Sequence, residues 1–263
     1  MRLSVSGTYA AGKTSTATAL SHYTGIPFAP ARSIREILPD AVPGKALAEV
    51  TPAEYLQLAV RRHVGRVQNE ARLGERLISD GSSLQEWIYA AARVRFGMDP
   101  AAPAEVPPRS AAMDFFAEAV DQLGHAFRQH VKETYDGFVH LKAAQGATGK
   151  AGGHRRMHPL FRGFCDDMLL RALDDLGVTY HVVEESSRSE RLKTIAGLFG
   201  LPAVRSVEEA LELAAGEYAA IDWRLEGERA PSAASLATAV PAAATGAVAA
   251  AGPVAAAPAE AGR

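Results

Sequence analysis

The sequence predicts an α/β fold of three layers, in which helices cover both faces of a mostly parallel β-sheet. Three observations lead to this prediction: strands alternate with helices along the chain, a glycine-rich turn joins the first strand to the first helix, and no internal repeat breaks the alternation. The chain has 263 residues, of which 48% are hydrophobic and 22% charged, an ordinary mixture for a globular protein.

The first half of the chain contains three of the expected strands. Its elements are a strand over 2–6, a helix over 13–22, an extended piece over 26–28, a helical turn or two over 33–38 that Pro39 stops, a helix from the Thr51-Pro52-Ala53-Glu54 start to about 73, a strand over 75–81 and a helix over 84–96. The Thr51 start combines a capping hydroxyl, a proline at the first helical position and an acid in the first turn.

The second half continues the alternation after a surface loop. Its elements are that loop over 100–108, a helix over 110–133, a strand over 137–142, a basic glycine-rich loop over 143–158, a helix over 160–176 closed by Gly177, a strand over 179–184, a helix over 188–198 closed by Gly200, and a final helix that begins at Ser206.

The end of the chain has a different composition. Residues 225–263 are rich in alanine and proline, and Pro241, Pro253 and Pro258 interrupt any helix there. Alanine buries too little surface to offset the entropy of the chain, so we expect a disordered tail and no membrane span. We therefore expect one domain over 1–224, with a lid at about 143–162.

Charge and cysteine content limit the classes of function. The net charge of −2 gives no reason to expect a nucleic acid or a membrane surface as partner. Cys165 is the single cysteine, so no internal disulfide can form, and we expect a buried thiol and a reducing, cytoplasmic location. We expect no signal peptide before the first strand.

The turn after the first strand carries the clearest chemistry. It matches the phosphate-binding motif G-x-x-x-x-G-K-[ST], also called Walker A, and the predicted nucleotide-binding residues are Gly7, Thr8, Tyr9, Ala10, Ala11, Gly12, Lys13, Thr14 and Ser15. Glycines let the backbone N–H groups point at phosphates, Lys13 adds a positive charge at the β- and γ-phosphates, and the Thr14 hydroxyl holds Mg²⁺. The alternative is a simple glycine-rich turn.

Asp80 ends the next long strand and is the second candidate. In a parallel sheet it would lie at the same edge as Lys13, where it could hold Mg²⁺ or accept the proton of a substrate hydroxyl. Its alternative role is to start a turn before Gly81. Since no glutamate follows Asp80 to activate water, transfer to a hydroxyl is favoured over hydrolysis.

Basic residues crowd the loop before the helix over 160–176. Among them, Arg155, Arg156 and Arg162 are predicted catalytic residues, at least one of which would reach the γ-phosphate when the loop closes as a lid. The alternatives are a solvated loop or contact with a nucleic-acid backbone.

The acceptor would lie near the stretch that follows the second strand. Arg32, Arg35 and Glu36 are predicted substrate contacts, with a surface ion pair as the alternative. Trp87 is predicted to stack on a substrate ring, with a place in the core as the alternative.

In these motifs the chain resembles the P-loop nucleoside and nucleotide kinases, most of all the nicotinamide riboside kinase (NadR-type) branch of AAA-like ATPase domains. The resemblance covers about residues 1–200 and depends on residues 7–14, 32–38, 77–82 and 155–191. It implies a P-loop NTPase fold, MgATP as the phosphate donor and a small hydroxyl compound as acceptor. That branch usually has an acid three residues before the arginine that matches Arg32, and this chain has Ala29 there.

The sequence thus predicts an ATP-dependent small-molecule kinase that uses ATP and Mg²⁺. The acceptor could be a nucleoside-like compound or a secondary metabolite. Two alternatives stay open, a nucleotide-hydrolysing regulator of a protein partner and a kinase of nucleic-acid ends.

Overall fold

The computed structural model describes residues 1–8, 11–104, 109–142, 157–184 and 187–220. The predicted tail over 225–263 and most of the predicted lid, including Arg155 and Arg156, lie outside the described residues.

A five-stranded sheet forms the centre of the molecule. Its strands are β1 (Arg2–Gly7), β2 (Phe28–Ala29), β3 (Leu77–Asp80), β4 (Gly137–Leu141) and β5 (Tyr180–Val183). All pairings are parallel, and the strand order is β2-β3-β1-β4-β5. The carboxyl ends of β1, β3 and β4 therefore meet at one edge, where β1 pairs Val5 with Asp80 and Ser6 with His140.

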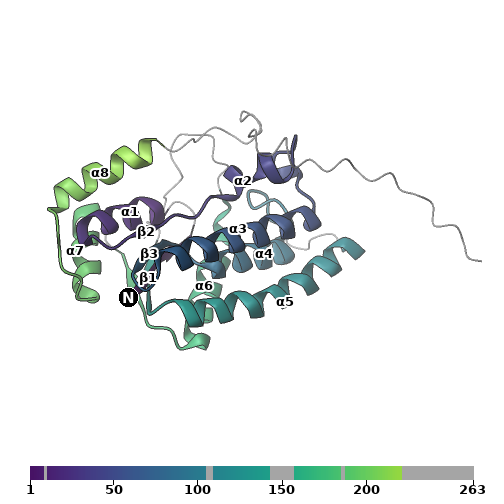
Figure 1. Cartoon of the computed structure of the whole chain (residues 1–263). Helices are drawn as coiled ribbons and strands as arrows, with labels where there is room; N and C mark the ends of the chain where they lie inside the picture. Colours follow the sequence, from purple (N-terminus) through teal and green to yellow (C-terminus); the bar gives the residue numbers. More distant parts are fainter. Residues whose placement is uncertain (9–10, 105–108, 143–156, 185–186, 221–263) are drawn as a thin grey trace, which may run out of the picture.

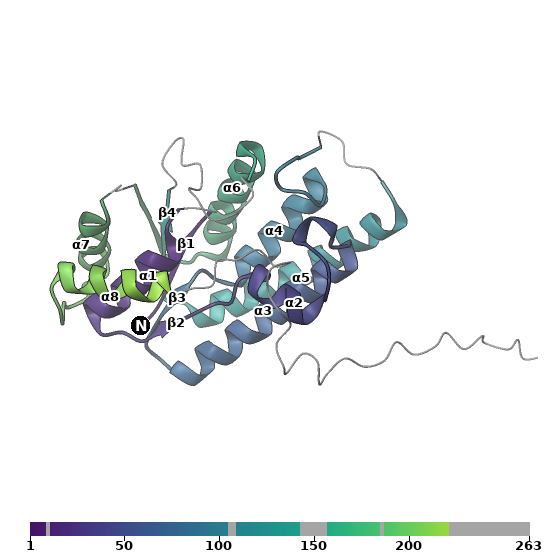
Figure 2. The ribbon, with the colours of Figure 1, turned by 90° about the horizontal axis from the view of Figure 1, so that it is seen from above.

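Helices cover both faces of this sheet. They are α1 (Lys13–Thr24), α2 (Ile34–Ala41), α3 (Pro52–Leu73), α4 (Ser83–Phe96), α5 (Ala111–Thr134), α6 (Pro159–Leu176), α7 (Arg188–Leu198) and α8 (Val207–Ala219), with a short 3₁₀ helix at Leu47–Glu49. Figure 1 shows these elements, and Figure 2 shows α1, α7 and α8 on one side of the sheet with α3, α4, α5 and α6 on the other. The predicted three-layer α/β/α fold is confirmed.

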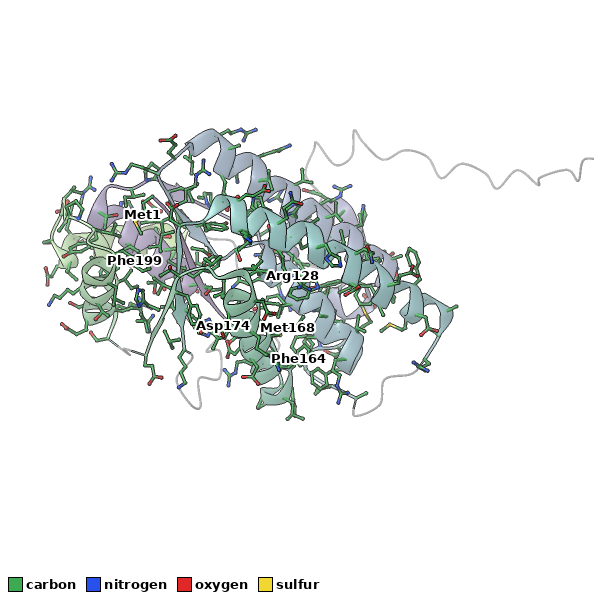
Figure 3. All side chains as sticks on the ribbon, turned by 90° about the horizontal axis from the view of Figure 1, so that it is seen from below. Met1, Arg128, Phe164, Met168, Asp174 and Phe199 are labelled. Atoms are coloured by element: carbon green, nitrogen blue, oxygen red, sulfur yellow. The ribbon has the colours of Figure 1, made fainter. Side chains whose placement is uncertain are left out.

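Two hydrophobic clusters explain the layers. Leu77 and Phe138 face the cluster built with α2 to α6, whereas the next residues along each strand, Ile78 and Val139, face the cluster built with α1, α7 and α8. Successive side chains of a strand point to opposite faces, so each buried strand serves both clusters. Figure 3 shows the molecule from below, from the side on which α5 and α6 lie, with Arg128 of α5 and Met168 of α6 labelled.

Capping sequences fix several helix starts as predicted. Thr51 accepts from the Glu54 N–H, and the Glu54 carboxylate accepts from the Thr51 N–H at 2.8 Å, which is the reciprocal arrangement that an S/T-x-x-E sequence favours. Pro39 does not stop α2, contrary to the prediction, because the helix continues to Ala41. A proline there removes a single bond near the helix end, and the Val42 N–H still donates to the Leu38 carbonyl at 2.8 Å.

Within the described part of the chain, no helix combines the length and apolar character needed to cross a membrane.

Candidate active site

The phosphate-binding loop has the backbone geometry that the motif requires. Gly7, the last residue of β1, has φ 139°, and a Cβ built there would lie 2.6 Å from the Leu141 carbonyl oxygen of β4. Gly12 adopts the left-handed conformation at the start of α1 and supplies no side-chain cap. The first N–H groups of α1 are thus left for an external acceptor, which is the arrangement that binds anions. Tyr9 and Ala10 lie outside the described residues.

Lys13 is folded back onto the loop. Its ammonium donates to the Thr8 carbonyl at 2.9 Å, and the Ala11 N–H donates to the same oxygen at 3.2 Å. Burial lowers the pKa of Lys13, and the carboxylates of Asp80 and Asp166 partly oppose this effect. A hydrogen bond from this partly desolvated ammonium to a charged phosphate oxygen would be stronger than its present bond to a neutral carbonyl. The geometry therefore suits an anionic ligand.

Thr14 and Asp80 meet at the edge of the sheet. The Thr14 hydroxyl donates to the Asp80 carboxylate at 2.7 Å, although 66 residues separate the two in sequence. β3 is the direct neighbour of β1, which brings Asp80 beside the loop. The described residues contain no group of three or more His, Cys, Asp and Glu side chains suited to a metal. One hydroxyl and one carboxylate do fit Mg²⁺, since that ion is commonly held by one or two carboxylates together with substrate phosphates.

A second carboxylate, Asp166 of α6, reaches the loop and was missed by the sequence analysis. It accepts from the Thr8 hydroxyl at 3.2 Å, and its other oxygen lies 3.3 Å from Nε2 of His140. His140 is 1% exposed and its Nδ1 lies 3.5 Å from the Ser6 hydroxyl, which donates to the Val139 carbonyl at 3.1 Å. The sequence gives two weak signals for this contact: Asp166 lies next to the buried face of α6, and His140 lies in a buried strand.

Arg191 of α7 lies against the first turn of α1. Its guanidinium donates to the Thr16 hydroxyl at 3.2 Å, and a Cβ built on Gly12 would lie 3.1 Å from its Nη1 atom. Arg191 is the last residue of the stretch on which the family resemblance depends, and no role was predicted for it. The structure adds its positive charge to the start of α1.

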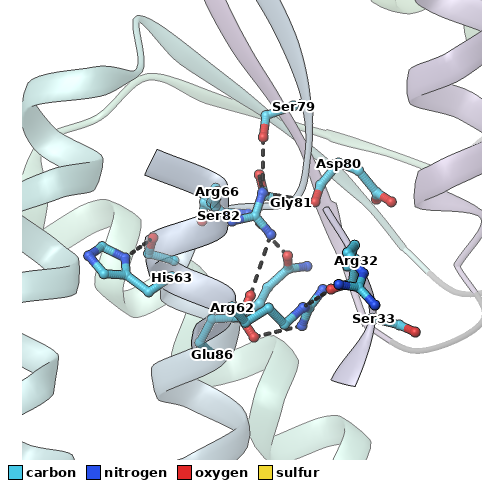
Figure 4. A network of polar contacts seen from close by, with 12 residues as sticks. Arg32, Ser33, Arg62, His63, Arg66, Ser79, Asp80, Gly81, Ser82 and Glu86 are labelled. Atoms are coloured by element: carbon cyan, nitrogen blue, oxygen red, sulfur yellow. Dashed lines mark hydrogen bonds and ion pairs between the residues drawn. The ribbon is translucent and has the colours of Figure 1, made fainter. Parts of the chain in front are cut away.

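Two arginines of α3 support the end of β3 (Figure 4). The Arg66 guanidinium donates to the Asp80 and Gly81 carbonyls at 3.1 and 3.0 Å and lies 3.4 Å from Glu86. Arg62 donates to Glu86 at 2.6 Å and to the Arg32 carbonyl at 2.7 Å. Glu86 is fully buried, so its charge is balanced by these two guanidinium groups.

The same network continues behind the strand through Glu70. This carboxylate accepts from the Ser79 hydroxyl at 2.9 Å and from the Tyr135 hydroxyl, and His130 lies 3.3 Å away. Burial alone would raise the pKa of Glu70, but His130, Arg66 and the hydroxyl donors lower it overall.

The predicted substrate residues at the start of α2 lie beside this network, and Arg32 and Glu36 make contacts within their own segment. The Arg32 guanidinium donates to the Glu36 carbonyl at 2.6 Å and lies 3.6 Å from Asp40. The Glu36 carboxylate accepts from the Ser33 N–H at 2.6 Å and so caps the helix. Arg35 is half-buried on the same helix. The Arg32 carbonyl joins the network through Arg62.

Trp87 and Arg162 lie on helices rather than in the loop. Trp87 is buried between α4 and α5, where a Cβ on Gly124 would lie 2.5 Å from its indole nitrogen and where the Arg128 guanidinium stacks 4.4 Å from the ring. Arg162 is half-buried in the first turn of α6 and donates its N–H to the His158 carbonyl at 3.0 Å. The structure does not bring either side chain to the described part of the loop.

Comparison with known proteins gives one family and several similar folds. A family model described as "AAA domain" matches residues 2–191. The chain is similar in structure to deoxyadenosine kinase from M. mycoides with bound dCTP, with a TM-score of 0.53, 11% identity, and coverage of 76% of this chain and 99% of that one. The same enzyme with bound dATP gives a TM-score of 0.53 at 13% identity, with the same coverage. At these identities the likeness concerns the fold alone.

A more distant match is the NadR protein in complex with NR, with a TM-score of 0.44, 13% identity, and coverage of 84% of this chain and 51% of that one. No curated protein matches the chain.

Proposed function

This chain belongs to the AAA domain family, and we propose that it is a MgATP-dependent phosphotransferase that moves the γ-phosphate of ATP to a hydroxyl group of a small molecule. The proposed acceptor is a nucleoside-like compound or a secondary metabolite. The similar fold of the M. mycoides enzyme, a deoxyadenosine kinase by its name, supports a kinase of this size and layout. We place the reaction in the cytoplasm, where ATP is supplied.

The contact between Thr14 and Asp80 carries this proposal. A hydroxyl at the start of α1 and a carboxylate at the end of β3, 2.7 Å apart, are the two protein ligands that a nucleotide-bound Mg²⁺ would need. When bound, Mg²⁺ would neutralise charge on the β- and γ-phosphates.

Cationic groups surround the proposed position of the phosphates. Lys13 would leave the Thr8 carbonyl for a phosphate oxygen, and the free N–H groups of α1 would bind the remaining oxygens. Arg191 adds a guanidinium beside the first turn of α1. We keep Arg155, Arg156 and Arg162 as proposed lid residues that stabilise the transferred charge.

The proposed chemical step is a displacement at the γ-phosphorus. The acceptor hydroxyl oxygen forms a bond to that phosphorus, the bond to the β,γ-bridging oxygen breaks, ADP leaves, and the hydroxyl proton passes to the Asp80 carboxylate. Asp80 is suited to this role because its side chain is only partly buried, while its own carbonyl is held by Arg66.

Transfer is favoured over hydrolysis by the carboxylates around Asp80. Glu86 is paired with Arg62 and Arg66, and Glu70 accepts hydrogen bonds from Ser79 and Tyr135. Carboxylates held in this way are poor bases for activating a water molecule. The residue after Asp80 is Gly81, which has no side chain to do so.

The acceptor is proposed to bind on the α2 side of Asp80. The Arg32 carbonyl accepts a hydrogen bond from Arg62, which also donates to Glu86, and this holds the residues before α2 next to the network. Arg32, Arg35 and Glu36 remain the proposed acceptor contacts, whereas Trp87 occupies the core position that was its alternative role.

A screen of acceptors tests the proposed function. Purified protein is incubated with MgATP and single members of a panel of nucleosides, nucleotides, sugars and aminoglycoside-like alcohols, and phosphorylated products are identified by mass. We expect ADP formation that depends on one class of acceptor and on Mg²⁺. ATP hydrolysis at the same rate without any acceptor would contradict the proposal.

Two substitutions test the assigned roles. Lys13→Ala should abolish turnover, and Asp80→Asn should lower kcat by roughly a hundredfold while ATP still binds, because a lost transition-state charge contact commonly costs about 3 kcal/mol. Steady-state kinetics and calorimetry with ATP measure the two effects. Asp121→Asn, at an exposed position of α5, is the matched control and should behave as wild type. Full activity of Asp80→Asn would remove Asp80 from the mechanism.

A further inference from the structure

A hollow lies beside the phosphate-binding loop, on the face of the sheet that α1, α7 and α8 cover. The space that the hollow encloses is about 110 Å³, and its mouth is open to solvent. Its walls include Ser15 of α1, Arg188 of α7, and Leu211, Ala214, Ala215 and Tyr218 of α8. The acceptor side of Asp80 lies across β3, toward α2 and α3, so the hollow is a separate place.

The walls of the hollow suit a flat, uncharged ring. Leu211, Ala215 and Tyr218 follow one another at spacings of three to four residues, which places them on one face of α8. The alanines leave room, while the Tyr218 ring and the Arg188 guanidinium are both exposed and offer surfaces on which a ring can stack.

Helix α8 packs against α1, so the residues of α8 that line the hollow have fixed positions. Ala214 is 3% exposed in the cluster with α1 and α7. His22 of α1 lies 2.8 Å from the Glu217 carboxylate, and Arg205 donates to the His22 carbonyl at 3.0 Å. These contacts hold the last turn of α8 and the residue two before its first turn against His22, in the last turn of α1.

The hollow lies beside the part of the phosphate-binding loop where the nucleoside of a nucleotide donor is expected. In a phosphate-binding loop the lysine reaches the β- and γ-phosphates, while the backbone N–H groups cradle the α- and β-phosphates. Ser15 follows Thr14 in the first turn of α1, so the hollow opens next to the cradle. Both Arg188 and Asp80 act on the pKa of Tyr218, which burial raises, so the Tyr218 hydroxyl is within electrostatic range of the site.

We propose that this hollow binds the nucleobase of the nucleotide donor, with the Tyr218 ring and the Arg188 guanidinium as its stacking surfaces. The inference rests on the proposed function and adds a specific contribution of α8. This helix lies beyond residues 2–191. In this proposal the base contacts a helix that lies outside the part of the chain matched by the family model.

Calorimetry on the full chain with two probes tests the proposal, using MgATP and Mg²⁺ with inorganic tripolyphosphate. Wild type should bind both and prefer ATP. Tyr218→Ala, and Ala215→Leu as a filling variant at an exposed position, should each weaken ATP binding by roughly tenfold and leave tripolyphosphate binding unchanged. Tyr218→Phe keeps the ring and should bind ATP as wild type does. Leu213→Ala, exposed on the same helix and outside the hollow, should also have no effect.

Three results would overturn the proposal. If both variants bind ATP as wild type does, the base lies elsewhere and the proposed function still stands. If both variants weaken ATP and tripolyphosphate equally, the hollow supports the phosphates and not the base. If wild type binds neither probe, the proposed function fails, and this inference fails with it.

Discussion

At the scale of single residues, the loop is held by two carboxylates from different elements. Asp80 accepts from Thr14 at 2.7 Å, and Asp166 accepts from Thr8 at 3.2 Å. The buried His140 lies 3.3 Å from Asp166, which fixes that carboxylate at its place beside β4. Asp166 contacts the hydroxyl of Thr8 and not that of Thr14, the proposed metal ligand. We therefore infer that Asp166 positions the loop.

Asp166→Asn tests this positioning role. The amide keeps the shape but replaces the charge opposite His140 and Lys13, so we expect weaker ATP binding, by roughly fivefold to tenfold, and a smaller loss in kcat than Asp80→Asn gives. Separate measurement of KM and kcat distinguishes the two residues. Asp167→Asn, the exposed neighbour on α6, is the control. An equal loss in kcat for Asp166→Asn and Asp80→Asn would place Asp166 in the chemical step instead.

At the scale of elements, glycines have opposite roles in the loop and in the helices. Gly7 joins β1 to the loop with φ 139° and approaches the Leu141 carbonyl, so any side chain there would collide with backbone. Gly163 lies exposed within α6, and a Cβ built on it meets nothing within 4 Å. The first is required by the close packing of β1 and β4, and the second only weakens a helix.

Gly163→Ala should therefore stabilise the protein, by about 0.5–1 kcal/mol, because alanine loses less backbone entropy in a helix. Gly7→Ala should destabilise it by more than 1 kcal/mol and lower ATP affinity as well. Urea unfolding monitored by circular dichroism gives both values. A loss of stability in Gly163→Ala would mean that α6 is packed differently at this position.

Helices α3 and α4 are joined by a buried ion-pair network behind β3. Glu86 of α4 lies between Arg62 and Arg66 of α3, which are 16% and 1% exposed in their side chains. Because Arg66 also donates to the Asp80 and Gly81 carbonyls, the same network sets the end of β3. The stability of this pair of helices and the position of Asp80 are thus linked.

Glu86→Gln should cost about 3 kcal/mol or more of unfolding free energy, since it removes the carboxylate paired with Arg62 and leaves Arg66 with Glu70 alone, 4.0 Å away. Glu190→Gln, which removes an exposed pair with Lys193 on α7, should change stability by less than about 0.5 kcal/mol. Chemical unfolding of the two variants provides the comparison. Similar small effects for both would show that water already screens the network.

At the scale of the whole molecule, stability should depend on pH through His63. This residue of α3 contacts the Ser83 hydroxyl at 2.7 Å, and burial, His130 and Arg66 lower its pKa from 6.5 to about 4, while Glu70 acts in the opposite direction. The unfolded chain therefore takes up a proton on His63 at higher pH than the folded chain does. The contribution of His63 is complete above pH 6.5 and is lost as pH falls from 6.5 toward about 4.

His63→Gln should flatten this pH dependence, because glutamine cannot take up the proton. Unfolding free energies at several values between pH 7 and pH 4.5 measure the slope. His125→Gln, exposed on α5, is the control and should keep the slope of wild type. An unchanged slope in His63→Gln would assign the pH dependence to other groups.

The sequence by itself determined the order of elements, the family and the phosphate-binding loop. These depend on local signals: capping boxes such as Thr51 with Glu54, glycines at the ends of helices, and a contiguous motif at residues 7–14. Even the meeting of Asp80 with Thr14 followed from the sequence, because parallel strands bring their carboxyl ends to one edge.

The tertiary structure alone decided which other side chains join the site. Asp166, Arg66 and Arg191 come from three helices, and Arg191 meets Thr16 across 175 residues. Helical periodicity shows which face of each helix is buried but not which atom a side chain on its flank will contact. That depends on how the layers pack, and the same packing places α8 over α1 and leaves the hollow beside Ser15.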